Sequence, residues 1–184
     1  AISVNTAGTG LGNGDSQNAS MDATGRYITF QSAASNVATN DTNTGLDVFL
    51  RDRVAGATAL VSVNTNGISS TSSSSGSPVL SKDGNVVVFL STANNLVAGD
   101  TNPSGADLFR RDLAAGTTTQ VASGVSLLAY APAARFIPAL SPDGRFVLYQ
   151  DAGKNLVVFD AVASSNSIIA TNVAASDAVM TDDA

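Results

Sequence analysis

Two long loops of this sequence carry oxygen-bearing side chains at a spacing that could hold a hard cation. These side chains are Asp41, Asn43, Asp47, Asp100, Asn102 and Asp107. Oxygen ligands at alternate positions, followed by another carboxylate, can wrap a calcium ion, which takes ~6–8 oxygens. The same residues can instead form Asx turns that satisfy loop amides, with Asp47 and Asp107 bonding backbone where a strand begins. The sequence therefore predicts either a calcium site or a self-satisfied turn in each loop.

The residues needed for the common kinds of enzyme active site are missing from the sequence. The chain contains no Cys, no His and no Glu, so thiol nucleophiles, His-based triads and Cys or His metal sites are excluded within it. Its serines have no His to act as a base, and its only lysines, Lys82 and Lys154, fall in predicted turns. We therefore predict that this chain is not an enzyme and needs no cofactor other than calcium.

The composition describes a folded, acidic chain with a weakly charged surface. Hydrophobic residues make up 43% of the sequence, charged residues 13%, and the net charge is −6. An acidic chain without a Lys/Arg cluster repels phosphate backbones, which argues against a nucleic-acid partner. No apolar run approaches the ~20 residues of a membrane span.

The sequence repeats itself at a spacing of about 60 residues. The segment 2–8 (ISVNTAG) recurs as 61–67 (VSVNTNG), and Asp-Thr-Asn at 41–43 recurs at 100–102. The segment 47–52 (DVFLRD) likewise matches 107–112 (DLFRRD). A repeat of this length is typical of stacked supersecondary units.

Each unit reads as four short strands, which we denote A to D, and we find no convincing helix. The A and B strands are joined by Asp-Gly or Thr-Gly turns and the C and D strands by turns that contain Gly, both typical of hairpins. The expected strands are A around 19–21, 78–80 and 138–140; B at 27–31, 86–90 and 146–150; C at 47–52, 107–112 and 155–160; and D at 58–63, 117–122 and 167–170.

Four-stranded units at this period predict an all-β propeller built of antiparallel blades. Three segments resemble the TolB-type (WD-like) β-propeller repeat family. They are the turns 81–84 (SKDG) and 141–144 (SPDG), each followed by an apolar strand, and the C strand 107–112 (DLFRRD). The resemblance covers nearly the whole chain. It implies the fold and leaves the function open, because that family includes scaffolds, accessory domains of enzymes and cell-surface proteins.

About three blades are expected, as a single partial propeller over 1–184. We predict a closing D strand at 1–6, blade 1 at 18–64, blade 2 at 77–123, blade 3 at 136–170 and the start of a fourth at 177–184. Propellers usually have about four to eight blades. Two interpretations stay open: the chain is part of a longer protein, or copies assemble and cover the open blade edges.

These features predict a non-catalytic scaffold or binding module. Its partner would be a protein or a glycan, or further blades of the same protein, in the periplasm, outside the cell or at the cell surface, within a homo- or hetero-oligomer. The alternative is an accessory propeller of a secreted hydrolase or peptidase whose catalytic domain lies outside this chain.

Overall fold

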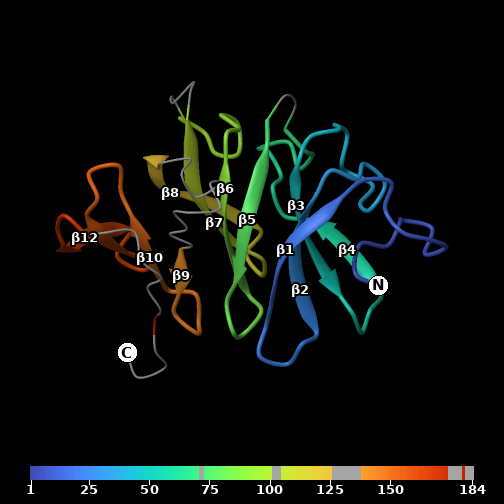
Figure 1. The fold of residues 1–184 in the computed structure, drawn as a ribbon, viewed down its shortest axis with the longest axis horizontal. Helices are drawn as coiled ribbons and strands as arrows, with labels where there is room; N and C mark the ends of the chain where they lie inside the picture. The colour runs from blue at the N-terminus through green and yellow to red at the C-terminus, as the bar shows by residue number, and fades with distance from the viewer. Residues whose placement is uncertain (71–72, 101–104, 126–137, 174–179, 181–184) are drawn as a thin grey trace.

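The computed structural model describes residues 1–70, 73–100, 105–125, 138–173 and 180, and within them it contains strands and no helix. The strands form three antiparallel four-stranded sheets in simple chain order, which we call blades 1, 2 and 3. Figure 1 shows the three blades side by side, with blade 2 in the middle. The all-β architecture predicted from the repeat is therefore confirmed.

Each blade takes four successive strands. Blade 1 contains β1 (Ser16–Met21), β2 (Tyr27–Ser32), β3 (Asp47–Asp52) and β4 (Ala57–Leu60). Blade 2 contains β5 (Ser75–Leu80), β6 (Val86–Ser91), β7 (Ala106–Asp112) and β8 (Thr117–Val125). Blade 3 contains β9 (Ala139–Leu140), β10 (Phe146–Gln150), β11 (Leu156–Asp160) and β12 (Ser165–Ala170).

The second and third strands lie where the sequence predicted them, whereas the outer strands differ in length. β4 ends at Leu60, three residues before the predicted end, and β8 runs on to Val125. All six residues of β6 are buried, as expected for an apolar strand with a blade on either side. The ends of the outer strands are harder to predict from the sequence, because each outer strand has a neighbouring strand on one edge only.

The A–B turns are built from a repeated set of hydrogen bonds. In blade 2 the Ser81 hydroxyl donates to the Asp83 carboxylate, and the Ser81 oxygen accepts from the Val86 amide at 3.0 Å. Ser141, Asp143 and Phe146 repeat this arrangement in blade 3. In blade 1 the acid occupies the serine position instead, since Asp22 accepts from the Tyr27 amide at 2.9 Å and from the Thr24 hydroxyl.

Apolar clusters between the blades hold the array together. Val48 and Val61 of blade 1 pack with Val87, Phe89 and Phe109 of blade 2. The next cluster joins Val88, Leu90 and Leu108 of blade 2 to Val147, Tyr149, Val157 and Phe159 of blade 3. Alternate residues of the middle strands thus pack against the blades on opposite sides. A one-residue slip in register would turn each of these side chains to the other face of the sheet.

The closing strand predicted at 1–6 and the fourth blade predicted to start at 177–184 both stay predictions. Residues 1–6 form no strand; Val4 makes an isolated antiparallel bridge with Leu11. Each of the three sheets already has its fourth strand, so no sheet among the described residues is left for residues 1–6 to complete. The segment 177–184 lies, except for Met180, outside the described residues.

The glycines of the A–B turns give a direct test of packing between blades. Gly25 and Gly144 have φ of +67° and +69°, and each would be strained by a Cβ. A Cβ on Gly144 would lie 2.5 Å from the Val86 Cβ in blade 2, whereas one on Gly25 would meet only the Arg53 Nη1, at 3.8 Å.

We therefore expect Gly25→Ala to reduce the free energy of unfolding by about 1–2 kcal/mol through backbone strain. Gly144→Ala should cost about 1–3 kcal/mol more, because overpacking against Val86 is added. Urea denaturation of both variants measures the difference. Equal losses would contradict the close contact between blades 2 and 3.

Candidate functional site

The first predicted cation loop is a closed hydrogen-bond network around Asp47. This residue is 2% exposed, and its carboxylate accepts from the Ser62 hydroxyl at 2.7 Å and from the Asn43 amide nitrogen at 2.9 Å. The Asn43 side-chain oxygen accepts from the Gly45 amide, and Asp41 accepts from the Asn43 amide at 3.3 Å. The structure therefore brings all three predicted residues together, with the Asx turns of the alternative prediction.

Burial dominates the electrostatics of this loop. It raises the pKa of Asp47 from 3.8 to about 6, although the hydrogen bonds from Ser62 and Asn43 act in the opposite direction. The nearby negative charge of Asp41 adds to the rise, and burial also raises the pKa of Asp41 itself. A positive charge in this loop would relieve both shifts.

Three serines complete the first loop and were not singled out from the sequence. Ser62 follows β4, while Ser69 and Ser70 belong to a Ser-rich run that reads as a flexible linker. Ser69 instead accepts from the Thr42 amide at 2.8 Å, and the Ser70 carbonyl accepts from the Asn43 side chain at 2.7 Å. A low-complexity segment gives no signal for such partners, because neighbouring serines look alike until the loop folds.

The second predicted loop is built differently. Asp107 is 2% exposed and accepts from the Gln120 side chain at 2.9 Å and from the Gly124 amide at 2.7 Å. Both donors come from β8, so this carboxylate ties β7 to the outer strand. Asp100 is partly buried at the end of its loop, and Asn102 lies outside the described residues.

In the part of the chain that the structure describes, no three His, Cys, Asp or Glu residues gather closely enough to hold a metal ion. Calcium at either loop stays a prediction, and the oxygens closest to forming such a site are those of Asp41, Asn43 and Asp47.

Aspartates at the ends of the C strands have a structural role in every blade. Asp52, Asp112 and Asp160 each accept a hydrogen bond from a backbone amide of the following turn. In blades 1 and 3 the carboxylate also pairs with an arginine of the same blade, Arg26 or Arg145, at 2.7 Å. These pairs lower the pKa of Asp52 and Asp160.

A cavity of about 370 Å³ opens between the outer strand of blade 2 and blade 3. We call it the β8 groove. It is lined by Gln120, Val121, Ala122, Ser123, Val125, Tyr149, Asp151 and Asn166. The Asn166 side chain crosses between the blades and donates to the Val121 carbonyl at 3.2 Å. No repeat motif marked this feature, because it forms between two blades.

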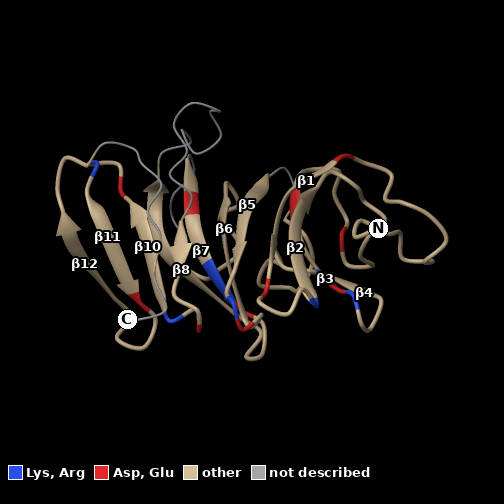
Figure 2. Ribbon diagram, turned by 60° about the horizontal axis from the view of Figure 1, so that its bottom comes forward, with Lys and Arg blue, Asp and Glu red and all other residues tan. Residues whose placement is uncertain are grey.

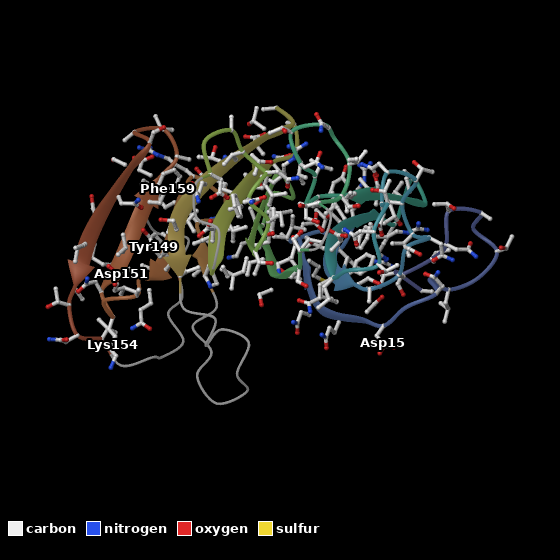
Figure 3. All side chains as sticks on the ribbon, turned by 90° about the horizontal axis from the view of Figure 1, so that it is seen from above. Asp15, Tyr149, Asp151, Lys154 and Phe159 are labelled. Atoms are coloured by element: carbon white, nitrogen blue, oxygen red, sulfur yellow. The ribbon has the colours of Figure 1, made fainter. Side chains whose placement is uncertain are left out.

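Tyr149 and Asp151 give the β8 groove its polarity. Burial by itself would raise the pKa of Asp151, but hydrogen bonds from the side chain and backbone of Asn155 outweigh it and lower the pKa. Burial, aided by the charge of Asp151, raises the pKa of Tyr149. At neutral pH the groove therefore presents a carboxylate beside a neutral phenol. Figure 3 shows these two residues on blade 3 with Lys154 nearby, and Asp15 at the opposite end of the array.

Charge is distributed unequally between the two ends of the blades. Figure 2 shows most lysine and arginine positions toward the end of the blades with the A–B and C–D turns, whereas acidic residues occur at both ends. In the sequence, Asp41, Asp100, Asp151 and Lys154 fall in the B–C loops, and Asp47 and Asp107 fall where the C strands begin.

The sequence matches no protein-family model and no curated protein closely. Its fold, however, matches solved propellers. A protein described as TolB from Agrobacterium tumefaciens is 14% identical, with a TM-score of 0.50 over 90% of this chain and 54% of that one. The propeller domain of the Trilobed protease from Pyrococcus furiosus is 10% identical, with a TM-score of 0.52 over 85% and 42%. Porphyromonas gingivalis dipeptidyl peptidase 4 is 13% identical, with a TM-score of 0.54 over 90% and 28%.

These matches and the three stacked sheets define the chain as a partial β-propeller. It spans between 28% and 54% of the length of the three structures compared. Within the described residues, no helix has the length and apolarity needed to cross a membrane.

The environment of Asp47 predicts how stability depends on pH. Because its pKa is higher in the folded state, the folded protein binds more protons between about pH 4 and pH 6, and stability falls as pH rises through this window. The loss should approach about 2–3 kcal/mol. Urea denaturation across this range should show that Asp47→Asn flattens the decline.

Asp143→Asn is the matched control, because the pKa of Asp143 is lowered and its contribution changes below this window. It should leave the slope intact. An unchanged slope in Asp47→Asn would contradict the buried-carboxylate account.

Calcium binding at the first loop predicts a higher melting temperature in millimolar calcium than in EDTA, because a ligand of the folded state stabilises it. Asp41→Asn should abolish that increase, and magnesium should not reproduce it. Identical melting curves with calcium and with EDTA would contradict calcium binding.

Proposed function

We propose that this chain is a non-catalytic propeller module that binds a protein or glycan partner in the periplasm or at the cell surface, within a larger assembly. The resemblance of its repeat to the TolB-type family supports this assignment. So does its acidic, weakly charged surface, which fits a partner that is neutral or positively charged.

One observation carries the proposal: equivalent aspartates serve equivalent turns in successive blades. Asp83 and Asp143 accept the amide two residues further on, and Asp52, Asp112 and Asp160 accept amides of the C–D turns. An active site is usually built once from a few positioned groups. Repetition of the same contacts therefore favours a scaffold over a catalytic role for these carboxylates.

The β8 groove is the binding surface that the geometry favours. It breaks the repeat, and it combines an apolar floor of Val121 and Val125 with the amides, hydroxyl and carboxylate of its rim. Binding sites typically show such a combination of apolar contact area and a few polar groups that fix orientation. Ligands with neutral hydroxyl or amide groups, as in a sugar or an extended peptide, fit this lining.

Nuclear magnetic resonance titration with a panel of neutral oligosaccharides and extended peptides tests the proposal. We expect amide shifts at 120–125 and 149–151 with at least one compound. Ser123→Phe should fill the groove and weaken binding at least about tenfold, or ~1.4 kcal/mol. Thr119→Phe is the control, since Thr119 lies on the same strand and does not line the groove. No shifts with any compound, or equal losses in the two variants, would contradict it.

A second function is favoured by the structural matches to peptidases. One matched structure, from a study of two prolyl endopeptidases, is 14% identical, with a TM-score of 0.52 over 86% of this chain and 22% of that one. As an accessory propeller, the chain would sit beside a catalytic domain and use the same groove to present substrate. A hydrolase domain encoded in the same reading frame would favour this function.

A further inference from the structure

Asparagine followed by glycine occurs twice in this chain, at Asn13-Gly14 and at Asn66-Gly67. In such a dipeptide the backbone nitrogen of the glycine can attack the side-chain carbonyl carbon of the asparagine, because glycine has no Cβ to hinder the approach. The reaction requires a carboxamide that is free to turn toward that nitrogen. Because the two dipeptides are chemically identical, their reactivity in the folded chain depends on their surroundings.

The fold holds the Asn13 carboxamide at both of its polar atoms. Its oxygen accepts from the Ser35 amide at 2.9 Å, and its nitrogen donates to the Ser35 hydroxyl at 3.2 Å. The Asn13 backbone amide donates to the Asn36 side-chain oxygen at 3.0 Å. Gly14 is closely packed as well, since a Cβ there would lie 2.6 Å from the Ala33 carbonyl. Attack at Asn13 therefore requires that these side-chain bonds break first.

Asn66 lies in an exposed turn and is much less constrained. Its side chain is exposed, and no hydrogen bond to any of the described residues holds its carboxamide. Its backbone amide donates to the Asn64 side-chain oxygen at 2.8 Å. A Cβ on Gly67 would meet no described atom within 4 Å. The reacting groups at Asn66 and Gly67 therefore have open space around them.

One hydrogen bond of this turn opposes the reaction. The Gly67 amide donates to the Asn64 carbonyl at 2.9 Å, and this bond has to open before the nitrogen can attack. Exposed turns open locally at a small fraction of the free energy of global unfolding. The bond therefore slows the reaction at Asn66 without preventing it.

We propose that Asn66 deamidates spontaneously in the folded protein and that the fold protects Asn13. The Gly67 nitrogen loses its proton and bonds to the Asn66 Cγ, while the Cγ–Nδ2 bond breaks and ammonia leaves with that proton. Water then opens the cyclic imide at one of its two carbonyls and gives aspartate or isoaspartate. The chain gains a water and loses an ammonia, and both products add a negative charge to the turn.

The isoaspartate product also alters the first predicted cation loop. Isoaspartate adds a methylene to the backbone between positions 66 and 67, and the Gly67 carbonyl accepts from the Asn40 side chain at 2.8 Å. Two residues further on, the Ser69 hydroxyl accepts from the Thr42 amide at 2.8 Å. A longer turn therefore displaces the atoms that hold this loop.

Mass spectrometry of tryptic digests measures both sites, because the peptides 1–26 and 54–82 each contain one of the two dipeptides. The folded chain is incubated in mildly alkaline buffer, in which the attacking nitrogen loses its proton more readily. Asn66 should deamidate at least about tenfold faster than Asn13, because the Ser35 hydrogen bonds add to the barrier at Asn13. In urea the two rates should become similar. Equal rates in the folded chain, or a difference that persists unchanged in urea, would overturn the proposal.

Ser35→Ala tests the protection of Asn13 directly. It removes the hydroxyl that accepts from the Asn13 carboxamide, so the rate at Asn13 should rise about two- to tenfold while the rate at Asn66 stays the same. An unchanged rate at Asn13 would contradict its protection by this contact.

The effect on the first predicted cation loop has its own control. The isoaspartyl form, separated by ion-exchange chromatography, should melt at a lower temperature than Asn66→Asp, which carries the same added charge on an unaltered backbone. Equal melting temperatures would overturn the inferred displacement of the loop.

Discussion

The whole array depends on the burial of the two middle strands of each blade from both sides. Val87 and Phe89 face blade 1 while Val88 and Leu90 face blade 3, and all four are at most 3% exposed. Burying apolar surface is the main favourable contribution to folding, and a single sheet can bury only what its neighbours cover. A blade of this kind is therefore stable only as a member of a stack.

Polar side chains in this protein mainly fix the conformation of the turns and the arrangement of neighbouring blades. The A–B turns use a Ser–Asp pair in blades 2 and 3 and an Asp–Thr pair in blade 1. The first residue of each pair supplies a side-chain oxygen, a hydroxyl or a carboxylate, that accepts from the equivalent amide. Buried polar side chains such as Gln31 link blades directly, since its oxygen accepts from the Ser77 amide at 2.8 Å. Such bonds are costly to leave unmade in a buried setting, and they restrict how neighbouring blades can be arranged.

The two candidate binding features lie outside the repeated contacts of the turns. The β8 groove lies along β8, the longest of the outer strands, and beside Tyr149 and Asp151 of blade 3. In the repeat, blades 1 and 2 carry Phe30 and Phe89 at the position of Tyr149, and Ser32 and Ser91 at the position of Asp151. In the loop around Asp47, the buried carboxylate accepts from Asn43 and Ser62, and the Asn43 side chain also donates to the Ser70 carbonyl. Both features lie at junctions, where side chains from distant parts of the sequence meet.

The sequence by itself determined the number of blades and the positions of the second and third strands. These features are encoded by residues close together in the chain: an apolar run bounded by a turn that contains Gly. Only the tertiary structure decided the lengths of the outer strands, the partners of Ser62, Ser69 and Ser70, the raised pKa of Asp47, the β8 groove and the contrast between Met21 and Leu80. The last pair makes the reason plain. Met21 and Leu80 are equivalent in the repeat, and their burial differs because a preceding blade covers one and not the other.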